Sequence, residues 1–425
     1  MTAPPPLPDP AAFEPARVLA RTGRAGAEIA DPWTPWDAPP DAPPDLEVAP
    51  DALQGAIDRI VAAGGRTRRH IRLTPGRGEG PVIVPRDAPP LTVTAPGGAE
   101  LGAAIDAEMP GAEWHRRFAG RFAASPPSVR AIAEGIAARG TITTHNSAVL
   151  RIEADDCILR GLAVENTHAC DRASAAPPGA VPDAQGRFAR GQHQAVALQV
   201  AGADRVQLDG LVLRSFQDTL YLQHPGPGTT ARTWLRGCEI AGDVDFIFGQ
   251  ATAFFSGCRI VSRGERGAPC WATAPATAIG TSYGFVFDRC RFEQDGHLAP
   301  GASRLGRQWF EGVRATPYGP PPRPGWRCRP GAVSSADPTG GTISRATLDS
   351  VGKCVVLRSD LGAHIAADPW DCWGGAPGSP RYRPAQHDRA EMATRLGGWL
   401  ARERVALTAE AGPGPWLGLF QCRRT

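Results

Sequence analysis

The sequence has no long apolar run, no strong excess of charge of one sign and no closely spaced cysteine pair. Its 425 residues carry 46 Lys and Arg against 43 Asp and Glu, for a net charge of +3. This near balance gives no reason to expect a nucleic acid partner. No stretch approaches the roughly 18 apolar residues of a membrane span. None of the ten cysteines forms a Cys-x-x-Cys pair, so a structural zinc site is not expected.

The length restricts the architecture. A single compact core rarely grows beyond about 250–300 residues, whereas a repeat fold adds core one layer at a time. Two domains or one elongated solenoid therefore fit 425 residues. The 50 Gly and 43 Pro punctuate short apolar runs, which favours a loop-rich β protein. Residues 1–48 are rich in Pro and Ala and are predicted to be a tail or linker, which leaves 49–425 as one domain.

A weak internal repeat begins near residue 155. Each unit has an alternating apolar strand, a turn-like pair often containing Gly, a buried apolar position and a second short strand. The units span residues 155–166, 204–215, 231–242, 251–262 and 283–294, with a sixth at 351–360. The aligned apolar positions are Leu162, Leu211, Cys238, Cys258 and Cys290. Repeats of about 20–30 residues built from short strands indicate a parallel β-helix, although an antiparallel β-sandwich could use similar strands.

Helical segments are expected at three places around this all-β core. Residues 51–63 have apolar side chains at helical spacing, with Asp51 placed to cap the first turn. Residues 107–138 read as a helical insertion over the fold. In a C-terminal extension of about residues 366–425, the stretch 386–400 is predicted to be a helix packed outside or across the end of the stack.

Two aspartates carry the strongest chemical signal. Asp218 and Asp245 lie in consecutive repeat units, and Asp245 sits inside the apolar run Asp-Phe-Ile-Phe-Gly. Equivalent positions one coil apart in a solenoid are about 5 Å from each other, the spacing of neighbouring strands. Two carboxyl groups at this distance separate their pKa values, so that one holds a proton while the other is ionised. This suits a nucleophile beside a general acid, although each aspartate could also cap a turn.

Amide and basic side chains accompany this pair. Gln194 and Gln217 can donate hydrogen bonds to a developing oxyanion. Arg307 can hold a carboxylate through a bidentate contact, and Trp309 offers a flat face for a sugar ring. Taken singly, each of these residues could equally be an ordinary surface side chain.

Five short segments together resemble the pectin methylesterase family. They read Thr-His-Asn-Ser-Ala from residue 144, QAVAL from 194, QDTLY from 217, GDVDFIFG from 242 and LGRQW from 305. The resemblance covers about residues 49–365. It implies a right-handed parallel β-helix, an ester hydrolase of the bacterial type that needs no metal or cofactor, pectin as the partner polysaccharide, and a monomer.

The resemblance also implies a role for each matching residue. Asp245 would attack the C6 methyl ester of a galacturonate, and Asp218 would protonate methanol and later activate water. Gln194 and Gln217 would hold the oxyanion, and Arg307 would orient Asp245. Substrate contacts would come from Thr144, Gln194, Val244, Phe248, Arg307 and Trp309.

A further implication of the resemblance is a disulfide between Cys238 and Cys258, expected if the chain reaches an oxidising compartment. The chain departs from the family where Gln308 replaces the usual proline and where the segment 75–79 is reduced. Pectin lies outside the cell, so export to the periplasm or beyond is expected. The first ~30 residues nevertheless lack the apolar stretch of a secretory leader.

Three other functions remain open on the sequence. A pectin-active glycosidase or lyase could also place paired carboxylates on a β-helix. A solenoid could serve as a non-catalytic carbohydrate-binding protein. An esterase or thioesterase of the same fold could act on a non-pectic ester.

Overall fold

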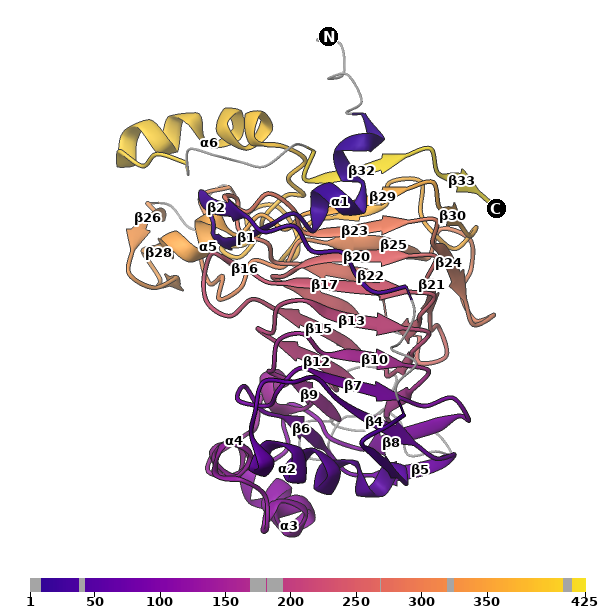
Figure 1. Ribbon diagram of the computed structural model, residues 1–425. Coiled ribbons are helices and arrows are strands. Elements are labelled where there is room, and N and C mark those ends of the chain that lie inside the picture. Colours follow the sequence, from indigo (N-terminus) through magenta and orange to yellow (C-terminus); the bar gives the residue numbers. More distant parts are fainter. Residues whose placement is uncertain are drawn as a thin grey trace.

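Three parallel sheets wind around a common axis. The computed structural model describes residues 9–37, 43–168, 181, 194–267, 269–318, 325–407 and 415–425. Each complete coil of the chain contributes one strand to each of three sheets, and successive coils pair in parallel (Figure 1). Incomplete coils at the two ends give the sheets ten, nine and eight strands. This is the parallel β-helix predicted from the repeat, and the parallel pairing excludes the antiparallel sandwich.

The strands of the three long sheets follow in coil order. The ten-stranded sheet contains β3 (Leu46–Val48), β4 (Arg69–Leu73), β7 (Leu91–Thr94), β10 (Ile158–Arg160), β13 (Val206–Asp209), β17 (Arg232–Arg236), β20 (Thr252–Ser256), β23 (Phe285–Asp288), β29 (Cys354–Leu357) and β32 (Leu417–Phe420). The nine-stranded sheet contains β5 (Gly76–Glu79), β8 (Ala99–Ala103), β11 (Ala163–Asn166), β14 (Val212–Arg214), β18 (Glu239–Gly242), β21 (Arg259–Ser262), β24 (Arg291–Gln294), β30 (Asp360–Leu361) and β33 (Arg423–Arg424). The eight-stranded sheet contains β6 (Val82–Val84), β9 (Leu150–Ile152), β12 (Leu198–Ala201), β15 (Leu220–Gln223), β19 (Ile247–Gly249), β22 (Cys270–Pro275), β25 (Ser303–Arg307) and β31 (Trp370–Asp371).

The interior is filled by columns of equivalent side chains. The aligned apolar positions of the repeat form one such column, in which each carbonyl accepts a hydrogen bond from the next coil, as from Glu239 N to Leu211 O at 2.8 Å. All of the members are buried, namely Leu162, Leu211, Cys238, Cys258 and Cys290. Ser359 continues the column, which confirms the sixth unit at 351–360. Stacking at the interstrand spacing lets small Cys and Leu side chains fill this line without gaps.

Helices and two small sheets surround the stack. The helical elements are η1 (Pro10–Phe13), α1 (Pro15–Val18), η2 (Pro50–Ala52), α2 (Leu53–Ala63), α3 (Gly111–Phe122), α4 (Pro127–Ala137), η3 (Thr144–Asn146), α5 (Arg345–Asp349) and α6 (Arg389–Glu403). The small sheets join β1 (Arg21–Arg24) and β2 (Ala27–Ala30) to β16 (Thr229–Thr230), and β26 (Arg327–Gly331) to β28 (Gly340–Ser344) and β27 (Ser335–Ala336).

The predicted helices occur with shifted ends. The 107–138 insertion is the pair α3 and α4, which lies beside α2 at the N-terminal end of the stack (Figure 1). Helix α6 begins three residues later than expected and buries Met392, Leu396 and Trp399. Asp51 does not cap α2, because its carboxylate instead accepts a hydrogen bond from Glu79 N at 3.2 Å. Within the extension 366–425, β31, β32 and β33 still add strands to the long sheets.

The N-terminal segment differs from the expected tail. Phe13, Val18 and Leu19 are buried in a cluster with outward-facing side chains of the ten-stranded sheet, including Phe254 and Val286. The Pro and Ala content suggested an extended linker, but these apolar side chains help to hold the segment against an apolar sheet face that water would otherwise cover.

A buried arginine fastens this segment to the stack. Arg232 on β17 is fully enclosed, and its guanidinium contacts Asp204 at 2.6 Å and Asp31 at 2.7 Å. Its Nη1 donates to Leu19 O at 3.0 Å. We expect Arg232→Met to lower the free energy of unfolding by about 2–3 kcal/mol, because Asp204 and the buried Leu19 O lose a charged hydrogen-bond donor. Urea denaturation followed by tryptophan fluorescence would measure the loss.

Arg236, at the end of the same strand, is the matched control. Its side chain is one-third exposed and pairs with Asp209 at 3.2 Å and Asp37 at 3.1 Å. Arg236→Met should cost about 1 kcal/mol or less, as exposed pairs do. Equal losses in the two variants would contradict an anchoring role for Arg232.

Candidate active site

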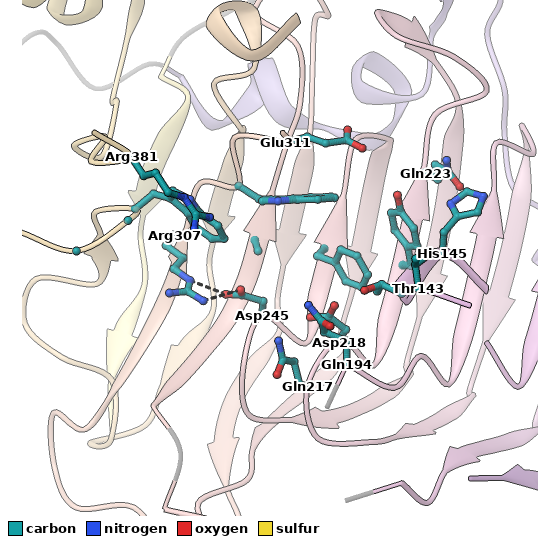
Figure 2. A pocket seen from close by; sticks show the side chains of 18 residues that line it. Thr143, His145, Gln194, Gln217, Asp218, Gln223, Asp245, Arg307, Glu311 and Arg381 are labelled. Carbon is teal, nitrogen blue, oxygen red and sulfur yellow. Dashed lines mark hydrogen bonds and ion pairs between the residues drawn. The ribbon is translucent and has the colours of Figure 1, made fainter. Parts of the chain in front are cut away.

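A cleft of about 670 Å³ opens on the outer side of the eight-stranded sheet. Its lining residues come from β12, β15, β19, β22 and β25 or the turns beside them, from η3, and from loops after β25 and β31. They are Thr143, Thr144, His145, Gln194, Gln217, Asp218, Tyr221, Gln223, Asp245, Phe248, Ala274, Arg307, Trp309, Glu311, Trp373, Gly374, Gly375 and Arg381. Figure 2 shows the labelled members gathered around the outward side of these strands.

The floor of the cleft is an outward-facing column. Tyr221 pairs in register with Phe248, and Phe248 with Ala274, so their side chains point to the same side of the sheet. The Tyr221 and Phe248 rings stack with their centroids 4.3 Å apart, and Trp309 meets Phe248 edge-on at 5.8 Å. Flat apolar surfaces beside polar groups are typical of sugar-binding clefts.

The two predicted aspartates occupy equivalent positions on adjacent coils. Leu220 pairs in register with Ile247, and Asp218 and Asp245 each lie two positions before these partners. The bond from Asp218 N to Val244 O at 3.1 Å extends this ladder back to the turn. Both residues have left-handed backbones, with φ of 68° for Asp218 and 52° for Asp245. Strain of about 1–3 kcal/mol per residue is typical of functional sites, where surrounding contacts enforce it.

Gly242 allows the chain to turn closely into this site. A Cβ at this position would lie 2.3 Å from Phe246 Cβ and 2.6 Å from Phe216 O. Only glycine fits, because the turns of two neighbouring coils touch here. The close approach brings Asp245 out of the apolar run and into the cleft.

Arg307 holds Asp245 by two parallel hydrogen bonds. Its Nε donates to Oδ1 at 2.9 Å and its Nη2 to Oδ2 at 2.8 Å (Figure 2). Two indole rings hold the guanidinium, with Trp271 at 3.8 Å and Trp373 at 4.6 Å from its centre. Trp271 is fixed in turn, because its Nε1 donates to Asp371 at 2.9 Å. The bidentate fork and the stacked rings fix the direction of the Asp245 carboxylate.

Asp218 has the opposite environment. Burial raises the pKa of this carboxyl well above its usual range, and the nearby Asp245 raises it further, against a smaller opposing effect of Arg307. A carboxyl group that stays protonated beside a carboxylate paired with arginine can give up a proton during a reaction.

A second, deeper ion pair lies behind the dyad. Asp243 is fully buried and accepts hydrogen bonds from Arg266 at 2.7 and 2.8 Å. It also accepts a bond from Val244 N at 2.6 Å. The guanidinium of Arg266 lies 4.6 Å from the Phe216 ring. This pair holds the backbone on the N-terminal side of Asp245.

The remaining predicted residues are placed as follows. Gln194, Gln217, Thr144 and Phe248 all line the cleft with the two aspartates. Figure 2 shows Gln217 and Gln194 close to the aspartates. Val244, expected to contact substrate, is half-buried and is not among the lining residues, although its neighbour Asp245 is.

Several residues of the site were not predicted from the sequence. Trp271, Trp373, Arg381 and Glu311 come from three different loops or strand ends, and only the fold brings them together. The position of Trp271 could have been predicted from the repeat. The register that pairs Ile247 with Thr273 also places Trp271 over Asp245 on the next coil. The irregular segment after β31 has no sequence pattern that would predict Trp373 or Arg381 as residues of the cleft.

Gln308 stands at the position where the pectin methylesterase family, which the sequence resembles, usually has proline. Its side chain has a structural role here. Its amide donates to Gly352 O and Gln386 O, both at 2.9 Å, and its Oε1 accepts from Gln386 N at 2.7 Å. These bonds tie the cleft segment to the C-terminal extension.

Cys238 and Cys258 are free thiols in the structure, and the disulfide expected for them in an oxidising compartment stays a prediction. Both thiols are buried in the internal column, where Cys238 donates to Leu208 O at 3.3 Å and Cys258 to Leu235 O at 3.7 Å. Each thiol thus points to a backbone carbonyl of the preceding coil.

The described ranges hold no candidate metal centre, because no group of three or more His, Cys, Asp or Glu side chains in them could hold a metal ion. No helix of the described ranges has the length and apolar character required to cross a membrane.

Known proteins share this sequence and fold. Residues 186–315 match the sequence family described as Pectinesterase. Pectinesterase B of Dickeya dadantii is 31% identical over 337 residues, which cover 72% of this chain and 73% of that protein. The chain belongs to the pectinesterase family. Pectinesterases are carboxylic ester hydrolases, and this chain is therefore an enzyme of that class.

Solved structures share the pectinesterase fold. The Escherichia coli protein YbhC has a TM-score of 0.69 at 19% identity, and 98% of this chain and 92% of that chain are covered. The rice weevil pectin methyl esterase has a TM-score of 0.66 at 19% identity, with 92% and 91% covered. These likenesses agree with the parallel β-helix described above.

Proposed function

We propose that this pectinesterase hydrolyses the C6 methyl esters of homogalacturonan and releases methanol, with Asp245 as nucleophile and Asp218 as acid and base. The observation that carries the proposal is the pairing of a carboxylate fixed by Arg307 with a neighbouring carboxyl group whose pKa is raised. Two amides line the same cleft, where an oxyanion would form.

The first half of the reaction forms an acyl-enzyme. A carboxylate oxygen of Asp245 attacks the ester carbonyl carbon, and the carbonyl oxygen becomes an oxyanion that accepts hydrogen bonds from Gln194 and Gln217. The intermediate collapses as the bond to the methoxy oxygen breaks. Asp218 gives its proton to that oxygen, and methanol leaves.

The second half restores the enzyme. Asp218, now ionised, removes a proton from a water molecule whose oxygen attacks the acyl carbon. The bond to Asp245 breaks, which frees its carboxylate and the galacturonic acid, and Asp218 is protonated again. Every group in this cycle is a side chain of the chain itself, so the proposal needs no metal or cofactor.

The cleft suits a polysaccharide that lies along the outer face of the sheet. Trp309 and Phe248 would contact sugar rings, and Thr144 would contribute a hydroxyl. Val244 would contribute a backbone contact only, since its side chain is not in the lining. We propose that the enzyme acts as a monomer, as its resemblance to the family implies.

A methanol-release assay on highly methylated pectin tests the proposal. We expect methanol without new reducing ends, since ester hydrolysis leaves the glycosidic bonds intact. New reducing ends would instead support the glycosidase or lyase. A simple acyl ester serves as the comparison substrate, and faster turnover of that ester than of pectin would contradict pectin as the substrate.

Gln217 provides a further prediction on the oxyanion. We expect Gln217→Ala to lower kcat by about 10²–10³-fold with little change in KM, because the amide would bind the oxyanion only in the transition state. Steady-state kinetics on methylated pectin would measure both constants. A variant with unchanged kcat and a raised KM would assign Gln217 to substrate binding instead.

A further inference from the structure

Two charged side chains of the catalytic cleft have no role in the proposed mechanism. Arg381 and Glu311 both line the cleft, and both are exposed. Among the described residues, the Arg381 guanidinium has neither an ion pair nor a hydrogen bond. No contact among the described residues therefore explains why the charge of Arg381 lies in the cleft.

The loop that carries Arg381 is anchored at its base. Trp373 and Arg383 exchange two backbone hydrogen bonds, at 2.8 and 2.9 Å. Arg383 is fully buried, donates to Thr347 O at 2.6 Å and stacks on Phe310 at 3.6 Å. Two arginines close together in the sequence thus differ completely, since Arg383 is enclosed by partners and Arg381 points its charge into the cleft.

The other charges of the cleft cancel or are absent. Asp245 and Arg307 form an ion pair, and burial, which raises the pKa of Asp218, favours the neutral form of that carboxyl. Burial, with a smaller contribution from the cation of Arg151, lowers the pKa of His145 to about 4, so this imidazole is neutral at neutral pH. The remaining formal charges among the described lining residues are those of Arg381 and Glu311.

These two charges lie apart. No ion pair joins them, and Figure 2 shows Arg381 beside Arg307, well away from Glu311 on the far side of Asp245. Glu311 accepts a hydrogen bond from Gln250 at 2.7 Å, which fixes its carboxylate at the border of the cleft. The cleft therefore carries a positive charge at the end where Arg381 lies and a negative charge at the edge where Glu311 lies.

We propose that Arg381 binds the free carboxylate of a galacturonate next to the methylated one, while Glu311 disfavours a carboxylate on its own side. A guanidinium is well matched to a planar carboxylate, and two like charges repel each other. The enzyme would then prefer methyl esters bordered on the Arg381 side by residues that are already demethylated. This inference rests on the proposed function, since it assumes a uronate polymer.

The experiment compares two substrates, highly methylated and sparsely methylated homogalacturonan. For Arg381→Gln we expect KM on the sparsely methylated polymer to rise about fivefold, with kcat unchanged and with little effect on the highly methylated polymer. Arg381→Lys should restore part of the loss. High salt should remove most of the difference between wild type and Arg381→Gln, because it screens an exposed charge.

Glu311→Gln is the reciprocal variant. It should lower KM on the sparsely methylated polymer and leave the highly methylated polymer unaffected. Arg116→Gln makes the same change of charge on helix α3, where the Arg116 guanidinium donates to Ala112 O of its own helix at 3.3 Å, and it should alter neither constant.

The outcomes separate the two proposals. Without methanol release by the wild-type enzyme from highly methylated polymer, the proposed function itself is wrong. If the wild type is active but Arg381→Gln changes both substrates equally, or neither, the carboxylate site is wrong and the esterase mechanism stands.

Discussion

Asp245→Asn is expected to reduce methanol release by at least about 10⁴-fold while the β-helix remains folded. An amide of the same shape cannot attack the ester carbonyl, so the acyl-enzyme does not form. Losses of this order are typical when a covalent nucleophile is removed. The measurement is kcat on highly methylated pectin, with circular dichroism and the thermal midpoint as the check on folding.

Asp156 offers a matched control for this change. It is another aspartate with a left-handed backbone, at φ 57°, but it pairs with Arg205 at 2.7 Å and lies outside the cleft. Asn tolerates this backbone region, so Asp156→Asn should keep full activity at some cost in stability. Full activity in Asp245→Asn, or a comparable loss in Asp156→Asn, would contradict the nucleophile assignment.

Arg307 explains why the nucleophile would be ready to react. Its fork fixes both oxygens of Asp245, and the stacked indoles of Trp271 and Trp373 leave the guanidinium little freedom. A carboxylate held in one direction loses less entropy on the way to the transition state than a free one. The two tryptophans would therefore contribute to catalysis through Arg307, as positioning residues.

The repeat made the fold and the dyad predictable. A solenoid stacks equivalent positions at a fixed spacing, so the alignment of Leu211 with Cys238 also implied that Asp218 lies over Asp245. The prediction required only the local pattern of two consecutive units. The column of buried Leu and Cys side chains was predictable for the same reason.

Segments outside the repeat were not predictable in this way. Residues 9–37 looked like a linker because Phe13, Val18 and Leu19 have no regular spacing, and their burial depends on a sheet face that is distant in the sequence. Trp373 and Arg381 lie on a loop whose position is set by the buried Arg383 and by Gln308. Long-range contacts of this kind leave no period in the sequence.

Asp218→Asn is expected to lower kcat by about 10²–10⁴-fold, because an amide can neither protonate methanol nor activate water. The raised pKa of Asp218 also gives the wild-type enzyme a pH dependence. Methanol release requires the protonated carboxyl, so kcat/KM should fall as the pH rises through this raised pKa. A decline in kcat/KM with rising pH that already begins at an ordinary aspartate pKa would contradict the assignment of Asp218 as the acid.

The raised pKa of Asp218 also means that ionisation of this carboxyl lowers the stability of the folded state at higher pH. Its folded-state pKa lies above the unfolded value, so the folded state binds the extra proton between the two values. The stability that the neutral carboxyl contributes is fully present below the unfolded pKa and is lost as the pH rises through the folded pKa. Asp218→Asn has no carboxyl to ionise, so its thermal midpoint should exceed that of the wild type by an increasing margin as the pH rises. A margin that stays constant over this range would mean that Asp218 is not a buried, protonated acid, and the enzyme would then need another source for the proton that leaves with methanol.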